Sequence, residues 1–537
     1  NNQAAGNDQQ GGAIYSPGRV VITDSTFSLN SAKTGTTADG GAIYLDASGS
    51  LEVHNSTFTN NTANGYGGAI FSKSMAELII ENSTFDNNTA TTGRGGALNH
   101  IAGKLTLSRS DFTNNHALHS SAGAIFLGSA TSSNKIDSCF FDNNTSAGGE
   151  QGGAVRNDGA LTLSNSTFTN NSVTDAGGGA ILVNAPATTI ENCTFTGNKA
   201  LGGDFGDGAA IYVSMGATLK NVSVVGNEAS NDGGGLYVEV TTPTTINNLT
   251  IAGNKAAKNG GGIFLKSGTL NFSNSIIAGN TDGIGNPDCF TTPAASTLNS
   301  TGPNLIQNQT TGCVVSGGGI ITGDPALAAS LANNGGPGMG RGGAHPTLTL
   351  AIKNNSQAFE KGANATCEPK DQRGVLRPQG TNCDLGAYEA SPTADLSTMA
   401  LNFSEQGIGS TSAVQTVTLT NNGPFPLTVN SISVGGANAG DFAQNNNCGA
   451  TVASEASCNI NVTFTPGASG PRNAGITVDT SASLGIQMIA LSGTGTTPSS
   501  GGGGGCNLNP GAKSFVSYAV FFPMLLALTG LRFIRKP

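Results

Sequence analysis

Apolar and polar residues alternate in short segments throughout the first half of the chain. Examples are AIYL at 42–45, SLEVHNSTF at 50–58 and ELIIENSTF at 77–85. A period of two is typical of β-strands, and no repeat holds a helix-length run with 3.6-residue spacing. The pattern predicts two or three short strands in each repeat, joined by corners rich in Gly and Asn.

Two short sequence motifs recur together with this pattern and define the repeat. One is a Gly-Gly-Ala step, whose third residue is Ala13, Ala42, Ala69, Ala97, Ala124, Ala154, Ala180, Ala210, Gly235 or Gly262. The other is F-x-x-N, with its apolar residue at Phe27, Phe58, Phe85, Phe112, Phe141, Phe168, Phe195, Val224, Ile251 and Ile277. The Asn of this motif is present in every copy, at Asn30, Asn61, Asn88, Asn115, Asn144, Asn171, Asn198, Asn227, Asn254 and Asn280. Copies spaced 26 to 31 residues apart, most often 27, predict a solenoid.

The strand pattern makes this solenoid a parallel β-helix, whose coils rise by about 4.8 Å each. The Phe or Ile of each copy is expected to point inward and stack on its counterparts. The Ala or Gly lets the backbone pass a tight place, and the Asn suits a left-handed corner. Its amide is also expected to bond to the Asn of the next coil and form a ladder. These positions are therefore predicted to serve folding.

The paired motifs resemble the repeats of polymorphic outer-membrane proteins and related bacterial surface β-helices, so residues 1–280 are expected to form a right-handed parallel β-helix. After 281 the run DQRGVLRPQGTNCDLGAYE resembles the end of surface β-helix proteins of the choice-of-anchor Q type. That resemblance implies that 281–391 continue the helix and close it with a cap. The matching residues are Asp371, Gln372, Arg373, Gly374, Arg377, Pro378, Cys383, Asp384, Gly386, Ala387, Tyr388 and Glu389. Their charged members favour a buried ion-pair clasp, with catalysis as the alternative.

Residues 392–497 alternate in short segments every 8–12 residues, which predicts a β-sandwich. TLTNNG and LSGTG in this part resemble the immunoglobulin-like choice-of-anchor D modules, which act as spacers or binding modules. A Gly-rich linker follows at 498–505. The fold class expected for the whole chain is therefore all-β: a right-handed parallel β-helix, an immunoglobulin-like β-sandwich and a C-terminal apolar helix.

The tail 506–537 carries Cys506, an apolar stretch at 514–531 and the basic end RFIRKP. This order is typical of a membrane segment with its C-terminus in the cytoplasm. It resembles the JDVT type of bacterial C-terminal sorting signal. The resemblance implies membrane contact through this segment, removal of it by an intramembrane sorting protease, and modification or release at Cys506. The chain begins with Asn inside a repeat, as expected of a fragment or a processed form.

Nine Cys give an odd count. Cys448 and Cys458 fit a disulfide within the sandwich, whereas Cys289–Cys313 and Cys367–Cys383 fit the cap. Such bridges imply an oxidising compartment. Cys139 and Cys193 share one register but lie two coils apart, about 9.6 Å, which is too far for a disulfide. Both are expected to be small core residues.

The amino-acid composition argues against several classes of binding partner. The net charge of −9 is spread thinly and no basic stripe is present, so nucleic acid is not an expected partner. Lys and Arg are sparse on the repeats, and the absence of Trp removes the commonest stacking platform for sugars. No catalytic residues are assigned and no cofactor is expected, except that Asp204 and Asp207 faintly resemble a calcium-binding loop. A polar turn is the favoured interpretation of that pair.

The sequence thus predicts a non-catalytic β-helix protein of a Gram-negative bacterium, secreted or placed on the cell envelope for adhesion, surface display or interaction. Its partner would be an unidentified protein or glycan at the cell surface. The main alternative is an extracellular polysaccharide lyase or glycoside hydrolase with a groove on the β-helix. Clustered acidic and basic residues from adjacent coils would favour the enzyme, and a uniform Asn, Thr and Ser face would favour the binding rod. An autotransporter passenger is a third reading.

Overall fold

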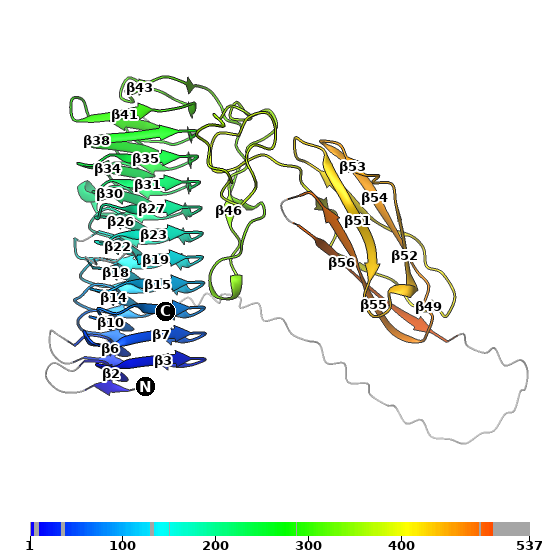
Figure 1. Ribbon diagram of the computed structural model, residues 1–537, viewed down its shortest axis with the longest axis horizontal. Coiled ribbons are helices and arrows are strands. Elements are labelled where there is room, and N and C mark those ends of the chain that lie inside the picture. Colours follow the sequence, from blue (N-terminus) through cyan, green and yellow to red (C-terminus); the bar gives the residue numbers. More distant parts are fainter. Residues whose placement is uncertain are drawn as a thin grey trace, which may run out of the picture.

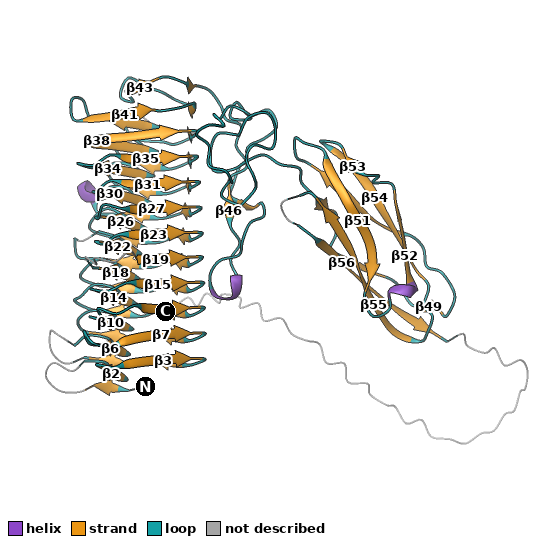
Figure 2. Cartoon of the chain, in the orientation of Figure 1, coloured by secondary structure: helices purple, strands orange, loops and turns teal. Residues whose placement is uncertain are grey.

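The computed structural model describes residues 2–4, 10–33, 38–128, 134–149, 151–285, 287–482 and 485–497. Strands and loops make up nearly all of this part, as Figure 2 shows. The described residues between 3 and 321 wind into a parallel β-helix, here called the rod, which stands beside a separate β-sandwich in Figure 1. The parallel solenoid predicted from the repeats is confirmed, with about ten turns in the described chain.

Four parallel sheets run along the rod, and each coil passes through them in the order B, C, D, A. Sheet A contains β1 (Gln3–Ala4), β5 (Ser31–Ala32), β9 (Thr62–Ala63), β13 (Thr89–Ala90), β17 (His116–Ala117), β21 (Thr145–Ser146), β25 (Ser172–Val173), β29 (Lys199–Ala200), β33 (Glu228–Ala229) and β37 (Lys255–Ala256). Sheet B contains β2 (Ile14–Ser16), β6 (Ile43–Leu45), β10 (Ile70–Ser72), β14 (Leu98–His100), β18 (Ile125–Leu127), β22 (Val155–Asn157), β26 (Ile181–Val183), β30 (Ile211–Val213), β34 (Leu236–Glu239), β38 (Ile263–Ser273) and β40 (Cys289–Thr291).

Sheet C shares the long β38 with sheet B. Its other strands are β3 (Arg19–Thr23), β7 (Ser50–His54), β11 (Leu78–Glu81), β15 (Leu105–Ser108), β19 (Asn134–Asp137), β23 (Leu161–Ser164), β27 (Thr188–Glu191), β31 (Ala217–Lys220), β35 (Thr244–Asn247), β41 (Ser296–Ser300) and β43 (Val315–Gly317). Sheet D contains β4 (Thr26–Ser28), β8 (Thr57–Thr59), β12 (Thr84–Asp86), β16 (Asp111–Thr113), β20 (Phe140–Asp142), β24 (Thr167–Thr169), β28 (Thr194–Thr196), β32 (Ser223–Val225), β36 (Thr250–Ala252), β39 (Ile276–Ala278), β42 (Asn304–Ile306) and β44 (Ile320–Ile321). One short 3-10 helix, η1 (Gly203–Phe205), lies in a loop of the rod.

Each full coil from β2 to β37 therefore has four strands, so the prediction of two or three was wrong. The strands of sheet A are only two residues long, and two residues carry no alternation that a sequence pattern can show. Strands of sheets B and C also follow each other closely, and in β38 they merge into one. The sequence pattern thus counts fewer strands than the backbone forms.

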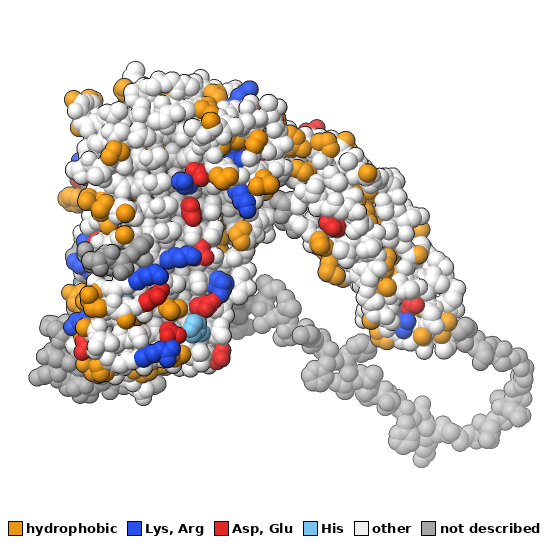
Figure 3. Space-filling model, viewed as in Figure 1, with side chains coloured by type: hydrophobic (Ala, Val, Ile, Leu, Met, Phe, Trp, Pro, Cys, Tyr) orange, Lys and Arg blue, Asp and Glu red, His pale blue; other side chains and the backbone are white. Residues whose placement is uncertain are grey.

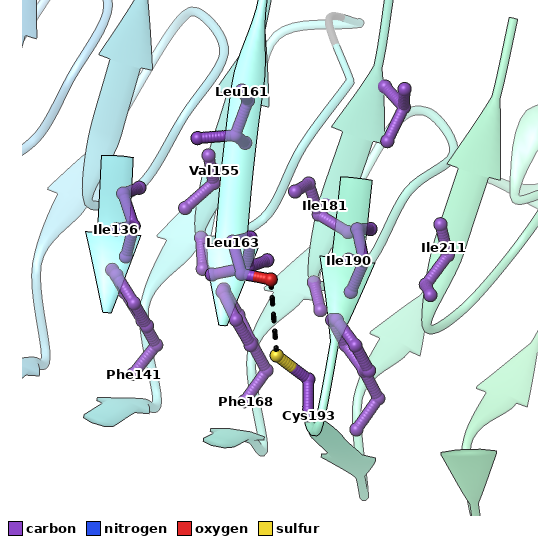
Figure 4. Packing of buried hydrophobic residues seen from close by; sticks show 14 of the residues in the cluster. Ile136, Phe141, Val155, Leu161, Leu163, Phe168, Ile181, Ile190, Cys193 and Ile211 are labelled. Carbon is purple, nitrogen blue, oxygen red and sulfur yellow. Dashed lines mark hydrogen bonds between the residues drawn. The ribbon is translucent and has the colours of Figure 1, made fainter. Parts of the chain in front are cut away.

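The Phe residues of the repeat form a stack along the interior of sheet D. Ring centroids of successive Phe from Phe27 to Phe195 lie 4.4 to 5.2 Å apart. Phe58 and the five Phe above it are fully buried. Aliphatic residues of sheets B and C fill the remaining interior, as Figure 4 shows around Phe141 and Phe168. Stacked rings at this distance add to the hydrophobic free energy of burial.

The conserved Asn of the repeat forms a buried ladder beside that stack. The Oδ1 of Asn115 accepts from the backbone N and the Nδ2 of Asn88, both at 3.0 Å. Its own Nδ2 donates to Phe85 O and to Asn144 Oδ1, both at 2.9 Å. The same side-chain contact joins Asn30, Asn61, Asn88, Asn115, Asn144, Asn171, Asn198, Asn227, Asn254 and Asn280 in succession. At the upper end, Asn280 bonds to the buried Asp288.

The left-handed corner lies one residue earlier than the sequence suggested. Asn60, Asn87 and Asn114, which precede ladder residues, have φ of 56°, 53° and 53°. None of the ladder Asn has a positive φ. The ladder position needs its amide inside the rod, whereas the turn needs a residue that tolerates a positive φ with its side chain outside. The assignment of both roles to one Asn was therefore wrong.

Cys139 and Cys193 belong to a third internal row. In lower coils this row holds Ser, and Ser56 N donates to Ser83 Oγ at 3.1 Å. Both thiols are free and fully buried. Figure 4 shows the Sγ of Cys193 directed at the carbonyl of Leu163, at 3.9 Å. Burial raises the pKa of Cys139 to about 12 and that of Cys193 further still, so neither is a nucleophile at neutral pH.

Residues 322–391, the flank segment, lie along the side of the rod in Figure 1. They contain β45 (Ala332–Asn333), β46 (Leu348–Thr349) and the 3-10 helix η2 (Arg341–Gly343). Arg341 Nη1 donates to Thr57 Oγ1 at 2.9 Å, and Asn221 Nδ2 donates to Lys370 O at 2.8 Å. These contacts lie many coils apart along sheet D and its corner with sheet C. The segment that was expected to cap the end thus runs back along the flank, after β40 to β44 have extended the helix.

Buried charges fix the end of the flank segment. Arg373 pairs with Asp371 at 2.7 Å, and Arg377 pairs with Glu389 at 2.9 Å. All four side chains are at most 1% exposed. Backbone groups add hydrogen bonds, since Asp371 also accepts from Glu389 N at 3.0 Å, although Arg377 Nε is buried without a partner. The charged run of 371–389 therefore forms a clasp.

The remaining strands form a β-sandwich. One sheet contains β47 (Asp395–Leu396), β50 (Gln415–Asn421), β52 (Phe442–Asn446) and β54 (Ala456–Phe464). The other contains β48 (Ala400–Asn402), β49 (Gln406–Gly407), β51 (Leu427–Gly435), β53 (Thr451–Val452), β55 (Gly470–Thr480) and β56 (Gln487–Thr496), and η3 (Ala439–Asp441) precedes β52. Val417 and Ile460 from one sheet pack with Ile476 and Ile489 from the other in a single core.

The structure contains the three disulfides expected from the sequence: Cys289–Cys313, Cys367–Cys383 and Cys448–Cys458. The first joins the upper coils, the second lies in the flank segment, and the third lies in the sandwich. The linker 498–505, Cys506 and the apolar stretch 514–531 lie outside the described residues. Within the described residues, no helix has both the length and the apolar character needed to cross a membrane.

Candidate functional site

A single row of side chains runs up the outer face of sheet B. It consists of the second residue of each strand, because Ile43 and Leu45 point into the core while Tyr44 between them points away. Strand pairing places these residues in register: Tyr15, Tyr44, Phe71, Asn99, Phe126, Arg156, Leu182, Tyr212, Tyr237, Phe264 and Phe290. We call this the outer row. Most of its members are covered by the corner loops, from Asn99 at 1% exposed to Tyr212 at 8%, whereas Tyr15 at the lower end is 52% exposed.

Two stacks of aromatic rings make up most of the outer row. In the lower stack, Tyr15 and Tyr44 are 5.4 Å apart, and Tyr44 and Phe71 are 5.1 Å apart. In the upper stack, centroid distances from Tyr212 to Phe290 are 4.6 to 5.4 Å. The upper stack is closely packed and mostly buried. The row is interrupted at Asn99, which stands between Phe71 and Phe126.

A hollow opens at this interruption. Its volume is about 350 Å³, and it is lined by Asp39, Tyr66, Phe71, Lys73, Arg94, Asn99, Ile101 and Phe126. Tyr66 and Ile101 lie at its rim, 41% and 37% exposed. Successive strands of sheet B supply Phe71, Asn99 and Phe126. Lys73 directly follows β10, and Asp39 and Arg94 come from corners that precede the sheet. The hollow is at the small end of ligand pockets, which are mostly apolar with a few placed polar groups.

The floor of the hollow contains an unusual polar atom. Asn99 is only 1% exposed, and its Nδ2 donates to the backbone carbonyl of Arg94 at 3.2 Å. Its Oδ1 is buried and has no hydrogen-bond partner. Most buried side-chain oxygens in folded proteins are paired, and leaving one unpaired has a free-energy cost of about 1–3 kcal/mol. Asn99 Oδ1 is thus an unpaired acceptor beneath the hollow, covered by its neighbours.

Charged side chains surround this floor. Lys73 Nζ lies 5.4 Å from the ring centroid of Tyr44 and 5.7 Å from that of Phe71. The guanidinium of Arg94 lies 4.9 Å from the ring centroid of Phe126. Asp39 Oδ1 accepts from the backbone N of Tyr66 at 2.8 Å. Cations on ring faces are held by the ring quadrupole as well as by counter-ions.

Burial raises the pKa of Asp39 to about 6, against the opposing effects of Tyr66 N and Lys73. The Tyr44 hydroxyl beside Lys73 raises the pKa of that ammonium. Lys73 is therefore cationic at neutral pH, and Asp39 takes up a proton in mildly acidic conditions. The hollow becomes more positive as the pH falls toward 5.

The weak calcium candidates, Asp204 and Asp207, lie elsewhere, in the loop that contains η1. Asp204 is exposed and accepts from Lys258 Nζ at 2.7 Å, which lowers the pKa of Asp204. Asp207 instead accepts from Asn231 Nδ2 at 2.7 Å and from the backbone N of Asp232 at 3.1 Å. Among the described residues, no group of three or more His, Cys, Asp or Glu is placed to hold a metal ion. The two carboxylates thus serve different partners in this loop.

The ladder Asn residues lie inside the rod, away from the hollow, and the cysteines of the three disulfides also lie outside it. Acidic and basic side chains do stand together on another face. They are interspersed on the lower part of the rod face in Figure 3, and Arg19–Glu52, Lys104–Glu77 and Arg109–Glu81 pair across adjacent coils. These side chains are partly exposed, so each pair stabilises the rod by only about 0–1 kcal/mol. Their mixed signs favour contacts between coils over attraction of a charged ligand.

Comparisons with known proteins identify the rod. A model of the right-handed β-helix region matches residues 1–141, 68–248 and 157–324, which together span 1–324 of 537 residues. The chain belongs to the right-handed β-helix family. No curated protein sequence matches this β-helix protein.

Similar solved structures share only short parts with this β-helix protein. A protein of unknown function from Porphyromonas gingivalis W83 is 14% identical, with 19% of this chain and 46% of that chain covered and a TM-score of 0.17. The secreted serine protease VesC from Vibrio cholerae is 21% identical over 17% of this chain and 21% of that chain, with a TM-score of 0.15. The ASH / PapD-like domain of human CEP192 is 15% identical over 19% of this chain and 85% of that domain, with a TM-score of 0.15. The alignment thus covers less than half the length of the first two proteins, and none of these likenesses bears on function.

The outer row was missed in the sequence, although its signal is visible there. The residue after the apolar position that follows each Gly-Gly-Ala step is aromatic in most coils, as in AIY at 42–44 and AIF at 69–71. Comparing that position across coils would have shown both the aromatic row and its interruption at Asn99. The Asp39 and Arg94 side chains are different, because they come from corners whose path the sequence does not determine.

Proposed function

We propose that this β-helix protein is a non-catalytic binding protein for adhesion or interaction outside the cell, with the exposed rim of the hollow, at Tyr66 and Ile101, as part of its contact surface. The observation that carries the proposal is the hollow at Asn99, where a buried oxygen without a partner lies among aromatic and charged side chains. The ladder Asn side chains of the described coils bond to one another, as at Asn115, so they are not offered to a partner. Its partner is an unidentified glycan or protein at a cell surface.

The proposed location is the cell envelope or the external medium. Three disulfides support it, because they form and persist in oxidising compartments. The proposed role of the tail 506–537 is that of a sorting signal that contacts the membrane and is cut by an intramembrane protease near Cys506. In this scheme the sandwich is an immunoglobulin-like spacer of the choice-of-anchor D kind, and the linker 498–505 joins it to the envelope.

A second function is an extracellular polysaccharide lyase or glycoside hydrolase. The observation that favours it is Asp39, a carboxyl group with a pKa of about 6, in the same hollow as Lys73. A carboxyl group near its pKa at working pH can act as a general acid or base. Hydrolysis by the usual route needs a second carboxylate facing the same bond, and the described lining of the hollow contains one carboxylate.

One experiment separates the two functions. The purified full chain is incubated with a panel of polysaccharides, with and without calcium, and both binding and chain cleavage are followed. Binding without cleavage supports the proposal. Cleavage that survives repurification and disappears in Asp39→Asn would make the protein an enzyme. If no polysaccharide or cell surface binds, the proposed function is wrong.

A further inference from the structure

We infer that the upper end of the rod is a self-association surface, where a second copy of this chain pairs end to end with the first. The edge strands β43 and β44 form this surface, and a twofold axis perpendicular to the rod relates the two copies. The inference goes beyond the proposed function and does not depend on it. It rests on the open strand edge, the apolar interior that reaches it, the absence of charge and the area of the end.

The last coil has two strands with no neighbour above them among the described strands. β43 pairs with β41 and β44 pairs with β42, both from the coil below. In Figure 1, β43 lies at the upper end of the rod and the flank segment lies beside the coils. An edge strand presents a row of unpaired backbone N–H and C=O groups, which is a template for another strand. Strands of two or three residues pair throughout the rod, so short length is no obstacle here.

The apolar interior of the rod also reaches this end. Leu298 and Ile306, in the coil below, are at most 1% exposed. Val315 pairs with Leu298 and packs on the same core as Ile320, but both are only partly buried. Val314, just before β43, is 63% exposed. A solenoid needs a covering end repeat, so a partner seated here would bury apolar surface that now meets water.

The charge of the chain favours a second copy as that partner. Residues 289–323 contain no Asp, Glu, Lys, Arg or His, although the whole chain has a net charge of −9. Natural edge strands are commonly protected by charged side chains or Pro, and 314–322 contain neither. Since like charges repel, copies of an acidic chain approach best at an uncharged end. Around a twofold axis, β43 of each copy runs antiparallel to β43 of the other, so their backbone groups are complementary.

The area of the end is sufficient for a weak dimer. A coil of 27 residues, at about 3.3 Å per residue, is about 90 Å around and encloses about 600 Å². Two copies that met over this whole outline would together bury about 1,200 Å², the lower limit for specific interfaces. We therefore expect a dissociation constant in the micromolar range.

Sedimentation velocity of the full chain measures the association, in a nonionic detergent that disperses the apolar stretch 514–531. We expect a shift from monomer to dimer between about 1 and 100 μM. Hydrogen exchange of peptides that cover 314–322 should slow over the same range, because pairing protects edge amides. A monomer at every concentration would overturn the inference. So would ever larger species, which a closed twofold contact does not form, or slow exchange already in the monomer.

Ser316 places a charge at the centre of the contact. It is exposed, lies in the middle of β43 and would face Ser316 of the second copy across the axis. Ser316→Lys should raise the dissociation constant about tenfold, because like charges then stand opposite each other. Thr245→Lys is the matched control, since the exposed Thr245 occupies the same register three coils lower. If both variants dimerise like the unmodified chain, the upper end is not the interface.

A mixture of two variants tests the pairing of identical copies directly. Ser316→Asp alone should dimerise as weakly as Ser316→Lys. An equimolar mixture of the two should restore dimers, because opposite charges then meet across the axis. Circular dichroism verifies that both variants fold. If both are folded and weakened but the mixture stays monomeric, the twofold contact at β43 is wrong.

Discussion

The Asn ladder should be the most sensitive polar feature of the rod, and Asn115→Ala tests it in the middle. The substitution removes four hydrogen bonds of 2.9 to 3.0 Å, two accepted from Asn88 and two donated to Phe85 O and Asn144 Oδ1. Asn115 is 0% exposed, so water cannot replace them without opening the coil. At about 0.5–1.5 kcal/mol for each bond, and with buried partners left unpaired, we expect a loss of about 3–5 kcal/mol in the free energy of unfolding.

The neighbouring residue provides a matched control. Asn114 has a φ of 53°, and its side chain bonds outside the core to Asp86 and Asn143. Gly holds the same corner position in upper coils, at Gly197 and Gly226, where φ is 65° and 70°. Asn114→Gly should therefore keep the corner and cost less than about 1 kcal/mol.

Urea unfolding followed by far-ultraviolet circular dichroism compares the two variants. Rod and sandwich can unfold in separate steps, so the shift of the rod transition is measured at unchanged slope. Hydrogen exchange of peptides around residues 85–145 adds a local readout, in which Asn115→Ala should lose protection over the adjacent coils. If Asn115→Ala shifts the transition no more than Asn114→Gly, the ladder does not stabilise the rod and the reasoning is refuted.

Three further predictions concern buried groups. Burial lowers the pKa of His100 from 6.5 to about 4, so folding favours the neutral imidazole. The free energy of unfolding should therefore be unaffected by His100 above pH 6.5 and should fall by about 3 kcal/mol as the pH drops to 4. His100→Leu should remove that part of the acid sensitivity in urea titrations between pH 7 and 4. The thiols of Cys139 and Cys193 should react with iodoacetamide only after unfolding, as mass spectrometry of labelled peptides would show. Asp371→Ala leaves the Arg373 charge buried and should loosen the flank segment by about 3–5 kcal/mol, measured as faster proteolysis within 322–391.

Each of these has a clear contrary result. An acid-induced loss of stability that is the same with and without His100 would show that other groups cause it. Labelling of Cys139 in the native protein at the rate of an exposed thiol would contradict its burial. Unchanged proteolysis in Asp371→Ala, with Asp371→Asn as the milder control, would mean that the clasp does not hold the flank segment.

The coil could be predicted from the sequence because the same physical demand recurs in every copy. Phe58 and Phe85 meet the same neighbours one coil apart, so their spacing reveals both the fold and the inward direction of the ring. The ladder Asn was predicted for the same reason. The backbone conformation of the ladder Asn was not predicted. Two adjacent Asn have different roles: Asn60 has the positive φ of the corner, and Asn61 places its amide inside the rod.

The flank segment shows why the remainder could not be predicted. Arg341 reaches Thr57, more than 280 residues earlier in the chain, and nothing local to either residue encodes that contact. Its Gly-rich surroundings gave no strand pattern, and a cap was the natural expectation for a segment that ends a solenoid. The hollow combines both cases. Phe71, Asn99 and Phe126 could have been found by comparing coils, whereas the approach of Asp39 and Arg94 depends on the paths of corner loops.

The repeat separates positions that can change singly over generations from positions that cannot. Interior positions are bound to their copies above and below, so an exchange at Asn88 or Phe85 disturbs three coils at once. An exchange at an exposed residue such as Tyr66 or Ile101 alters one step of the exterior, and the coils beneath it keep their register. Single substitutions can therefore change the outer surface at one coil, about 4.8 Å from the next, while the packing inside the rod stays the same. Relatives with the same interior could in this way come to recognise quite different surfaces.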